Sequence, residues 1–306
     1  MKIAIVGGAG FIGSHFTDLV LQDFKIQEVV VIDSLTYAGK ISNLSQCTKN
    51  SKFKFIKANL MNPNEYSSHI QNFDFVVNFA AESHVDRSIS GPDIFFETNA
   101  LGVSILTRTC MEIGVGRFIQ VSTDEVYGPI NVGESDEKTI LNPSSPYSAS
   151  KAGGELFALS FWQTYGYPVV VTRGSNTYGP RQYPEKLIPL ALNNLRTNKK
   201  IPVYGTGLQT REWTYVIDHV DAIYRVMLQG NSGSVYNIGS GQRFTNLEIV
   251  KMLIMKMGKN ENEIQFVQDR KGHDFRYALD CNLIKNQLNW SPKKTFKEHL
   301  EQINDW

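Results

Sequence analysis

The sequence predicts an α/β protein built on a doubly wound parallel sheet, followed by a smaller C-terminal α/β domain. In the first half of the chain, short and almost wholly apolar runs alternate with helix-like segments. This alternation is typical of parallel strands covered by helices on both faces. Beyond about Asn176 the rhythm loosens and prolines punctuate the chain, at positions 180, 184, 189 and 202. A change of architecture is therefore expected there.

The expected strands are short buried runs, and the expected helices lie between them. The strands cover residues 2–6, 29–32, 53–56, 73–77, 117–121, 169–171 and 235–238. The helices cover residues 11–21, 99–113, 146–165 and 247–257, with Thr245 as the expected N-cap of the last. Because parallel crossovers are right-handed, the first six strands predict a doubly wound order.

Two domains are expected from the 306 residues. The first covers residues 1–176, with part of 205–230 returning to it, and the second covers residues 177–306. The change of rhythm near Asn176 sets the boundary.

Composition excludes several classes of protein. With 31 basic and 30 acidic residues the net charge is +1, which disfavours non-specific nucleic-acid binding. No apolar run reaches the roughly 18 residues that a membrane span needs. The three cysteines, Cys47, Cys110 and Cys281, are far apart, so neither a disulfide framework nor a metal site is expected. These features favour a reduced, cytoplasmic protein.

A glycine-rich loop joins the first strand to the first helix. Residues 7–13 read GGAGFIG, and Asp33 follows Gly13 by twenty residues, at the end of the second strand. Glycines let backbone N–H groups approach a pyrophosphate at a helix N-terminus, and an acidic residue at this distance accepts hydrogen bonds from a ribose. A lone glycine loop is often only a tight turn, but strand, helix and acid together predict a Rossmann-type domain that binds NAD.

Tyr147 and Lys151 are four residues apart on an expected helix, and so share one face. A nearby lysine lowers the pKa of a phenol, and such a tyrosine can take a proton from an alcohol as hydride leaves. With 13 tyrosines in the chain, this spacing is also expected about once by chance. Its position after the glycine loop and the run 121–123 favours the chemical interpretation.

Adjacent carboxylates, Asp124 and Glu125, follow the expected strand 117–121. Ligands of parallel sheets bind beyond the carboxyl ends of strands. Two like charges at such a place raise one carboxyl pKa, which gives one protonated donor and one ionised acceptor. Two solvated loop carboxylates are the alternative, and the residues alone do not decide between them.

Together, the glycine loop, Thr123 and the Tyr147/Lys151 pair resemble the extended short-chain dehydrogenases/reductases. Longer strings resemble more narrowly the dTDP-glucose 4,6-dehydratase family. They are LTYAG at 35–39, AAESHVDRSI at 80–89, STDEVYG at 122–128, PYSASK at 146–151, PEKLIP at 184–189 and GHDFRY at 272–277. The resemblance runs from Met1 to about Trp290.

The resemblance implies an NAD-dependent hydro-lyase of deoxysugar biosynthesis, acting on a nucleoside-diphosphate hexose. Tyr147 would remove the proton from the sugar C4 hydroxyl while hydride passes to NAD⁺, and Glu125 would then remove the C5 proton. Asp124 would protonate the departing C6 hydroxyl, after which hydride returns to C6 and a proton to C5. Thr123 would hydrogen-bond O4, and Lys151 would hold the nicotinamide ribose.

The resemblance also implies binding residues and an assembly. Cofactor-binding positions are Gly7, Gly10, Phe11, Ile12, Gly13, Asp33, Ser34, Leu35, Thr36, Gly39, Asn59, Leu60, Phe79, Ala80, Ala81, Ser83, Thr98, Tyr147 and Lys151. Substrate-binding positions are Ser83, Thr123, Asn176, Lys186, Leu187, Val203, Tyr204, Arg211, Asn246, Arg270, His273 and Tyr277. A homodimer built on the helices 99–113 and 146–165 is expected.

Four places depart from the family pattern. Asn59 stands where an aspartate is common, Thr177 replaces the second asparagine of a pair, Lys271 replaces a proline, and residues 242–243 are Gln-Arg where Asn-Glu is common. The last three lie near the expected substrate side. UDP-glucose or UDP-N-acetylglucosamine therefore stay open as substrates. A nucleotide-sugar 4-epimerase, which would not need Asp124 and Glu125, and a non-catalytic NAD-binding module are the alternative functions.

Overall fold

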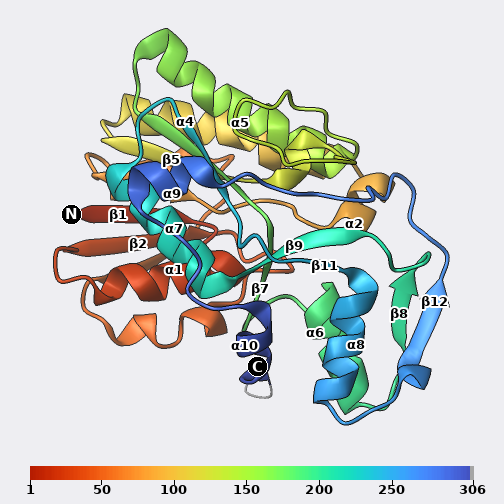
Figure 1. Ribbon diagram of the computed structural model, residues 1–306. Coiled ribbons are helices and arrows are strands. Elements are labelled where there is room, and N and C mark those ends of the chain that lie inside the picture. Colours follow the sequence, from red (N-terminus) through yellow and green to blue (C-terminus); the bar gives the residue numbers. More distant parts are fainter. Residues whose placement is uncertain (304–306) are drawn as a thin grey trace.

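The computed structural model describes residues 1–303 and is built on one large parallel sheet (Figure 1). Seven strands run in the order β10-β6-β5-β4-β1-β2-β3, and every neighbouring pair is parallel. They are β1 (Lys2–Val6), β2 (Glu28–Asp33), β3 (Phe53–Lys57), β4 (Phe75–Asn78), β5 (Arg117–Thr123), β6 (Val169–Gly174) and β10 (Val235–Ile238). The predicted doubly wound sheet is confirmed.

Helices cover both faces of this sheet. On one face, α1 (Phe11–Gln22), α7 (Val216–Gln229) and α9 (Asn282–Leu288) share a buried cluster with the strands. On the other, α4 (Gly102–Glu112) and α5 (Pro146–Tyr165) share a second cluster. Two short helices, α2 (Val85–Ser90) and α3 (Asp93–Phe96), and a π-helical turn, η5 (Glu97–Leu101), lead into α4. The apolar strand runs are therefore buried on both sides, as their lack of polar alternation predicts.

A smaller group of elements lies beyond the carboxyl ends of β5 and β6 (Figure 1). Its two sheets have the orders β11-β9-β7 and β12-β8. The strands are β7 (Asn176–Tyr178), β8 (Ile201–Tyr204), β9 (Thr210–Tyr215), β11 (Arg243–Thr245) and β12 (Ile264–Val267), and the helices are α6 (Leu187–Arg196), α8 (Asn246–Lys256) and α10 (Phe296–Leu300). A third buried cluster, which includes Trp213 and Phe296, fills the space between them.

Helices α5 and α8 begin within one residue of the positions that the sequence predicts. Helix α5 begins after Ser145, whose hydroxyl accepts the Ser148 N–H at 3.1 Å, and ends at Gly166 with a φ of 67°. Thr245 caps α8 by accepting the Glu248 N–H at 3.1 Å. The helix expected at 99–113 starts differently, because Glu97–Leu101 forms a π-helical turn in which Asn99 bonds the backbone of Glu82.

The chain returns to the large sheet over a longer stretch than residues 205–230. Helix α7 packs on α1, but β10 also pairs with β6, and α9 packs on the same face. Strand β9, which lies inside the expected return, belongs to the smaller sheet instead. The cause is the apolar run 235–238, which is buried on the edge of the large sheet beside β6. The boundary near residue 176 stays a prediction.

Short 3-10 turns complete the described chain. They are Ile41–Leu44, Cys47–Lys49, Pro63–Glu65, Ser67–His69, Asp124–Tyr127 and Glu261–Glu263. Within residues 1–303, no helix has both the length and the apolar character needed to cross a bilayer.

Candidate active site

Three cavities lie where the carboxyl ends of the strands in the large sheet face the smaller group of elements. The first, of about 150 Å³, is lined by the glycine loop and the end of β2. The second, of about 200 Å³, lies over the end of β5. The third, of about 160 Å³, extends between the two parts of the molecule. The second and third share Ser83, Glu125, Asn176 and Lys186 in their walls, so they are parts of one cleft.

The first cavity has the features that a dinucleotide needs. Gly7 has a φ of 77°, and a Cβ there would lie 2.5 Å from the Ala80 nitrogen, so only glycine fits this turn. Helix α1 begins at Phe11, after the N-cap Gly10, with no side-chain cap and no acidic residue in its first turn. Its N–H groups and the positive end of its dipole are therefore available to a phosphate.

Asp33 is held in place by the same loop. Its carboxylate accepts the Ala9 N–H at 2.9 Å and the Leu35 N–H at 2.8 Å. Burial raises the pKa of Asp33, and these two backbone donors lower it. A Cβ at Gly39 would lie 2.6 Å from the Asp33 Oδ1, so a side chain there would cover the carboxylate. The carboxylate lines the cavity and keeps acceptor capacity for a ribose hydroxyl, so the residues present fit NAD.

Tyr147 and Lys151 lie on α5, and both are buried. Tyr147 lines the second cavity. Burial and the Glu125 carboxylate raise the pKa of Tyr147, while the Thr123 hydroxyl lowers it. Lys151 donates from Nζ to the Val121 carbonyl at 2.7 Å, and burial lowers its pKa to about 8. The lysine is thus anchored to the end of β5, one turn along the helix from the phenol.

Asp124 and Glu125 form the turn that follows β5, and their surroundings differ. Asp124 is 2% exposed; its Oδ1 accepts the Thr123 hydroxyl at 3.1 Å, and its Oδ2 has no hydrogen-bond partner within residues 1–303. Burial, together with the charges of Glu125 and Glu212, raises the pKa of Asp124 well above its ordinary value.

Glu125 is also buried enough to raise its pKa, but three cations oppose this: Arg211, Lys186 and Arg270. The pair is therefore polarised, because Asp124 favours the protonated form more strongly than Glu125 does. Both side chains line the second cavity, and Glu125 lines the third as well. One donor and one acceptor thus face the same space, as an acid and a base would.

Cations gather around the third cavity. Lys186 donates to the Ser83 carbonyl at 2.7 Å. The Arg211 guanidinium lies 4.5 Å from the centre of the Tyr277 ring, and that of Arg270 lies 4.8 Å from the centre of the Tyr204 ring. Guanidinium and ammonium groups of this kind suit a diphosphate.

Most of the residues expected to bind ligands line these cavities. The first holds Gly7, Gly10, Asp33, Ser34, Thr36, Gly39, Asn59, Leu60, Ala80, Ala81 and Thr98. The second holds Phe11, Ile12, Ser83, Thr123, Asp124, Glu125, Tyr147, Asn176 and Lys186. The third adds Leu187, Arg211, Asn246, Arg270, His273 and Tyr277.

Six expected residues do not line a cavity. Four are cofactor positions. Gly13 packs under the loop, where a Cβ would lie 2.4 Å from the Gly7 carbonyl oxygen; Leu35 and Phe79 pack against the core, and Lys151 is buried behind Tyr147. Of the two substrate positions, Val203 has its side chain in the core of the smaller part, and Tyr204 stands outside the wall, 37% exposed.

Sequence reasoning missed several residues of the walls. His219, on α7, is buried and lines the second cavity, where its Nδ1 lies 2.6 Å from the Thr177 hydroxyl. Gln182 lines the second and third cavities, and Asp274 lines the third. Asp274 belongs to the string GHDFRY and could have been found there, whereas nothing local in the sequence marks His219.

A doubly wound sheet with a dinucleotide cradle and a polarised acid–base pair defines a cofactor-dependent enzyme of the nucleotide-sugar type. The family model described as GDP-mannose 4,6 dehydratase matches residues 4–303, so the chain belongs to this family.

Relatives and solved structures agree with this assignment. The dTDP-glucose 4,6-dehydratase of Streptomyces niveus is 42% identical over 310 residues, covering 100% of this chain and 92% of the relative. DesIV, the dTDP-glucose 4,6-dehydratase of Streptomyces venezuelae solved with NAD and TYD bound, has a TM-score of 0.98 at 42% identity, over 100% of this chain and 96% of that one. The expected resemblance to the dTDP-glucose 4,6-dehydratases is confirmed.

An epimerase structure is also similar. The UDP-glucuronic acid 4-epimerase of Bacillus cereus, solved with UDP-glucuronic acid and NAD, has a TM-score of 0.92 at 29% identity, over 98% of this chain and 97% of that one. The fold alone therefore does not separate dehydratases from epimerases.

Proposed function

We propose that this chain dehydrates a nucleoside-diphosphate hexose, dTDP-glucose, to the 4-keto-6-deoxy sugar nucleotide with NAD as a resident cofactor. The observation that carries the proposal is the polarised pair Asp124–Glu125, which lines the same cavity as Tyr147. Oxidation of a sugar alcohol needs only a base, whereas loss of water needs an acid and a base together.

Tyr147 acts on the C4 hydroxyl. NAD⁺, which the glycine loop and Asp33 would hold, would supply the acceptor and later the donor of the hydride. Tyr147 takes the hydroxyl proton, and the Thr123 hydroxyl, which lowers the pKa of Tyr147, holds the sugar oxygen in line. Lys151, fixed by the Val121 carbonyl at 2.7 Å, supports the cofactor ribose.

The two carboxyl groups then divide the elimination. The C4 ketone acidifies the C5 hydrogen, and Glu125, whose pKa is raised by burial and lowered by the charges of Arg211, Lys186 and Arg270, takes that proton. Asp124, kept protonated by burial and by the charge of Glu125, gives its proton to the departing C6 hydroxyl, and water leaves. Their different surroundings thus assign the two roles.

The third cavity holds the nucleoside diphosphate. Arg211, Lys186 and Arg270 line this cavity with Tyr277 and His273, and the three cations suit a diphosphate. The relatives named for dTDP-glucose support thymidine as the base. Arg243 stands where the family commonly has glutamate, so the assay varies both the base and the sugar of the substrate.

A product assay tests the proposal. Purified protein is incubated with dTDP-glucose, UDP-glucose and their N-acetyl counterparts, and the 4-keto-6-deoxy product is detected by its absorbance in alkali. We expect product from dTDP-glucose. Epimerised sugar without this absorbance would replace the dehydratase by an epimerase.

A homodimer and a cytoplasmic location complete the proposal. Apolar side chains are exposed on the face formed by α5 and the turns before α4: Leu156 is 55% and Phe157 is 48% exposed, with Phe96 at 59% and Leu101 at 41%. Such a patch is typical of a subunit interface. Light scattering at micromolar concentration should give twice the mass of the chain, and Leu156→Glu should give the monomer mass.

A further inference from the structure

Arg243, in β11, binds three separate parts of the chain. Its Nε lies 3.0 Å from the Glu212 Oε2 and its Nη1 lies 2.7 Å from the Glu134 Oε1. Its Nη2 donates to the Leu279 carbonyl at 3.1 Å. These partners belong to β9, to the loop after the Asp124–Tyr127 turn, and to the segment 274–280. One planar guanidinium therefore joins three segments that are far apart in sequence.

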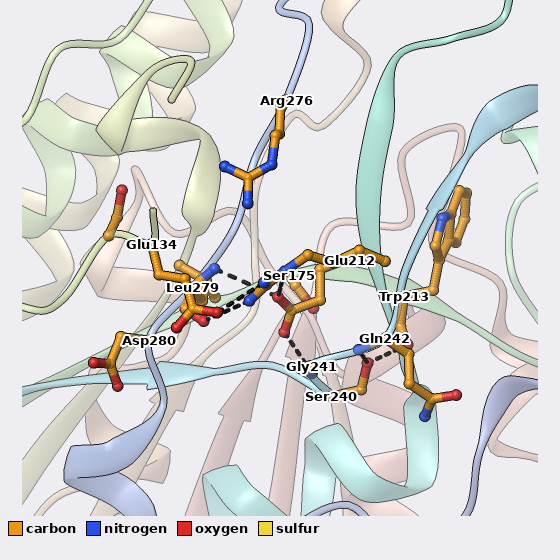
Figure 2. Close-up of polar contacts among 12 residues, drawn as sticks. Glu134, Ser175, Glu212, Trp213, Ser240, Gly241, Gln242, Arg276, Leu279 and Asp280 are labelled. Carbon is orange, nitrogen blue, oxygen red and sulfur yellow. Dashed lines mark hydrogen bonds and ion pairs between the residues drawn. The ribbon is translucent and has the colours of Figure 1, made fainter. Parts of the chain in front are cut away.

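Glu212 lies at the centre of this group. Its side chain is fully buried, and it also accepts the Gly241 N–H at 2.9 Å and the Leu279 N–H at 3.4 Å. In Figure 2, Glu212 lies among Glu134, Leu279 and Gly241, with dashed contacts joining the group. A fully buried carboxylate needs a partner charge, so the position of Arg243 is tightly fixed.

The same strand carries a residue of the third cavity. Arg211 precedes Glu212 in β9 and, besides stacking on the Tyr277 ring at 4.5 Å, donates to the Asp274 carbonyl at 2.8 Å. The segment 274–280 is thus attached to β9 from the cavity side by Arg211 and from the buried side by Glu212. Tyr277 lies between the two attachments.

Through Glu134, Arg243 also binds the loop that follows Asp124 and Glu125. The Ser135 N–H donates to the Ala278 carbonyl at 2.9 Å, and the Asp280 N–H donates to the Ser135 carbonyl at 2.9 Å. Glu134, the neighbour of Ser135, brings the carboxylate that Arg243 holds. Backbone bonds also join the segment to β9, where the Thr210 N–H donates to the Phe275 carbonyl at 2.8 Å. Arg243 adds side-chain bonds that reach loop, segment and strand at once.

We propose that Arg243 is a positioning residue for the nucleotide sugar: it braces β9, the loop 129–135 and the segment 274–280, so that Arg211 and Tyr277 are preformed as a binding pair. The inference rests on the proposed function. It depends on the fork of the guanidinium, which bonds three acceptors in one plane, and a lysine ammonium cannot reproduce that geometry.

Two substitutions and one control test the proposal. Arg243→Met removes the brace, and Arg243→Lys keeps the charge beside Glu212 but not the fork. Arg225→Met is the control, because Arg225 on α7 makes similar contacts away from the cavities: Asp221 at 3.2 Å and the carbonyls of Leu288 and Asn289 at 3.5 and 3.3 Å. For each variant we would measure KM and kcat with dTDP-glucose, the Kd of dTDP by calorimetry, and the melting temperature.

We expect KM and the Kd of dTDP to rise about tenfold in both Arg243 variants, with kcat changed by less than about threefold, and neither constant to change in Arg225→Met. Wild-type affinity for dTDP in Arg243→Lys would show that a positive charge beside Glu212 is enough, and would overturn the positioning proposal. An equal loss of affinity in Arg225→Met, or a lower melting temperature with unchanged KM and Kd, would also overturn it. If neither Arg243 variant folds, Arg243 serves stability and the positioning proposal is wrong.

The dTDP titration separates this inference from the proposed function. If wild-type protein binds dTDP but forms no 4-keto-6-deoxy product, the dehydratase proposal fails. The Kd of dTDP in the Arg243 variants then still tests whether Arg243 positions the binding residues. If wild-type protein binds neither dTDP nor UDP, both proposals fail.

Discussion

The cofactor cradle and the nucleotide-sugar cavity are built in different ways. The central residues of the cradle are close in sequence, because Gly7, Gly10 and Asp33 fall within the first 33 residues. Their arrangement depends mainly on backbone geometry. The nucleotide-sugar cavity takes side chains from positions between Ser83 and Tyr277, on many separate segments. A short motif can therefore specify the first site, whereas only the complete fold assembles the second.

The two sites also differ in the charged side chains that line them. Within the described residues 1–303, no lysine or arginine lines the cradle cavity, where the backbone N–H groups at the start of α1 suit a phosphate. The other cavity is lined by Lys186, Arg211 and Arg270. Binding of the nucleotide sugar should accordingly depend more on salt than binding of the cofactor does.

The largest expected effect is at Tyr147, which lines the second cavity, over the end of β5. Tyr147→Phe removes the base for the C4 hydroxyl, so even the first reduction of the bound cofactor should slow by about two to four decades. Single-turnover absorbance of the reduced cofactor measures this step. As a control, Tyr165→Phe, near the exposed end of the same helix, should leave this rate unchanged. A normal rate of cofactor reduction in Tyr147→Phe would show that Tyr147 is not the base.

A smaller effect should be confined to the cradle. Asp33→Ala removes the carboxylate that bonds the ribose and repels a 2′-phosphate, so the preference for NAD over NADP should fall about tenfold to a hundredfold. Titration of both cofactors into cofactor-free protein gives the two dissociation constants. The affinity for dTDP should not change. An unaltered preference would mean that Asp33 does not contact the ribose.

The smallest expected effect concerns stability in the smaller part of the molecule. His299 stacks on Tyr215 with 3.8 Å between ring centres, and burial lowers its pKa from the ordinary 6.5 to about 4. Between these values the unfolded chain binds the extra proton, so stability is present above pH 6.5 and is lost as the pH falls towards 4. From pH 7 to pH 5 this loss is at most about 2 kcal/mol, and solvent screening of the ring reduces it.

His299→Phe should remove this part of the acid sensitivity, since a phenyl ring keeps the stack and takes no proton. Denaturant unfolding at pH 7 and pH 5 compares the variants, with exposed His69→Phe as the control. Part of the slope should remain, because buried His219 also has its pKa lowered to about 4. Equal slopes in His299→Phe and wild type would show that His299 is not held neutral.

The sequence predicted the large sheet well because its signals are local. Buried strands appear as apolar runs, and the start of α5 is marked by Ser145 and Pro146. The π-helical turn at Glu97–Leu101 has no such mark, since it depends on Asn99 bonding the distant Glu82. The return of β10 and α9 to the large sheet was missed for a similar reason: a short apolar run such as 235–238 fits either part.

The parts of the candidate site that are contiguous in the sequence could be predicted, whereas the parts assembled from distant segments could not. The adjacent residues 123–125 and the pair Tyr147/Lys151 stand out by spacing, but their chemical roles came from the resemblance. His219 has no local signal, because its partner Thr177 is far along the chain. Arg243 stands out in the sequence only as a departure from the family pattern, and its partners Glu134 and Glu212 are known only from the fold. Polarisation of Asp124 against Glu125 likewise depends on burial and on cations that only the fold brings near.

The central claim, that Asp124 and Glu125 carry out an elimination after Tyr147 has started an oxidation, is tested most directly by Glu125→Gln in a single turnover in deuterated water. The account predicts that this variant still reduces the bound cofactor and forms the 4-keto sugar. The variant should fail to exchange the C5 hydrogen, and its overall turnover should fall by about two to four decades. Asp124→Asn should likewise reduce the cofactor but lose water slowly. Near-normal turnover in Glu125→Gln would contradict the dehydratase mechanism and favour an epimerase.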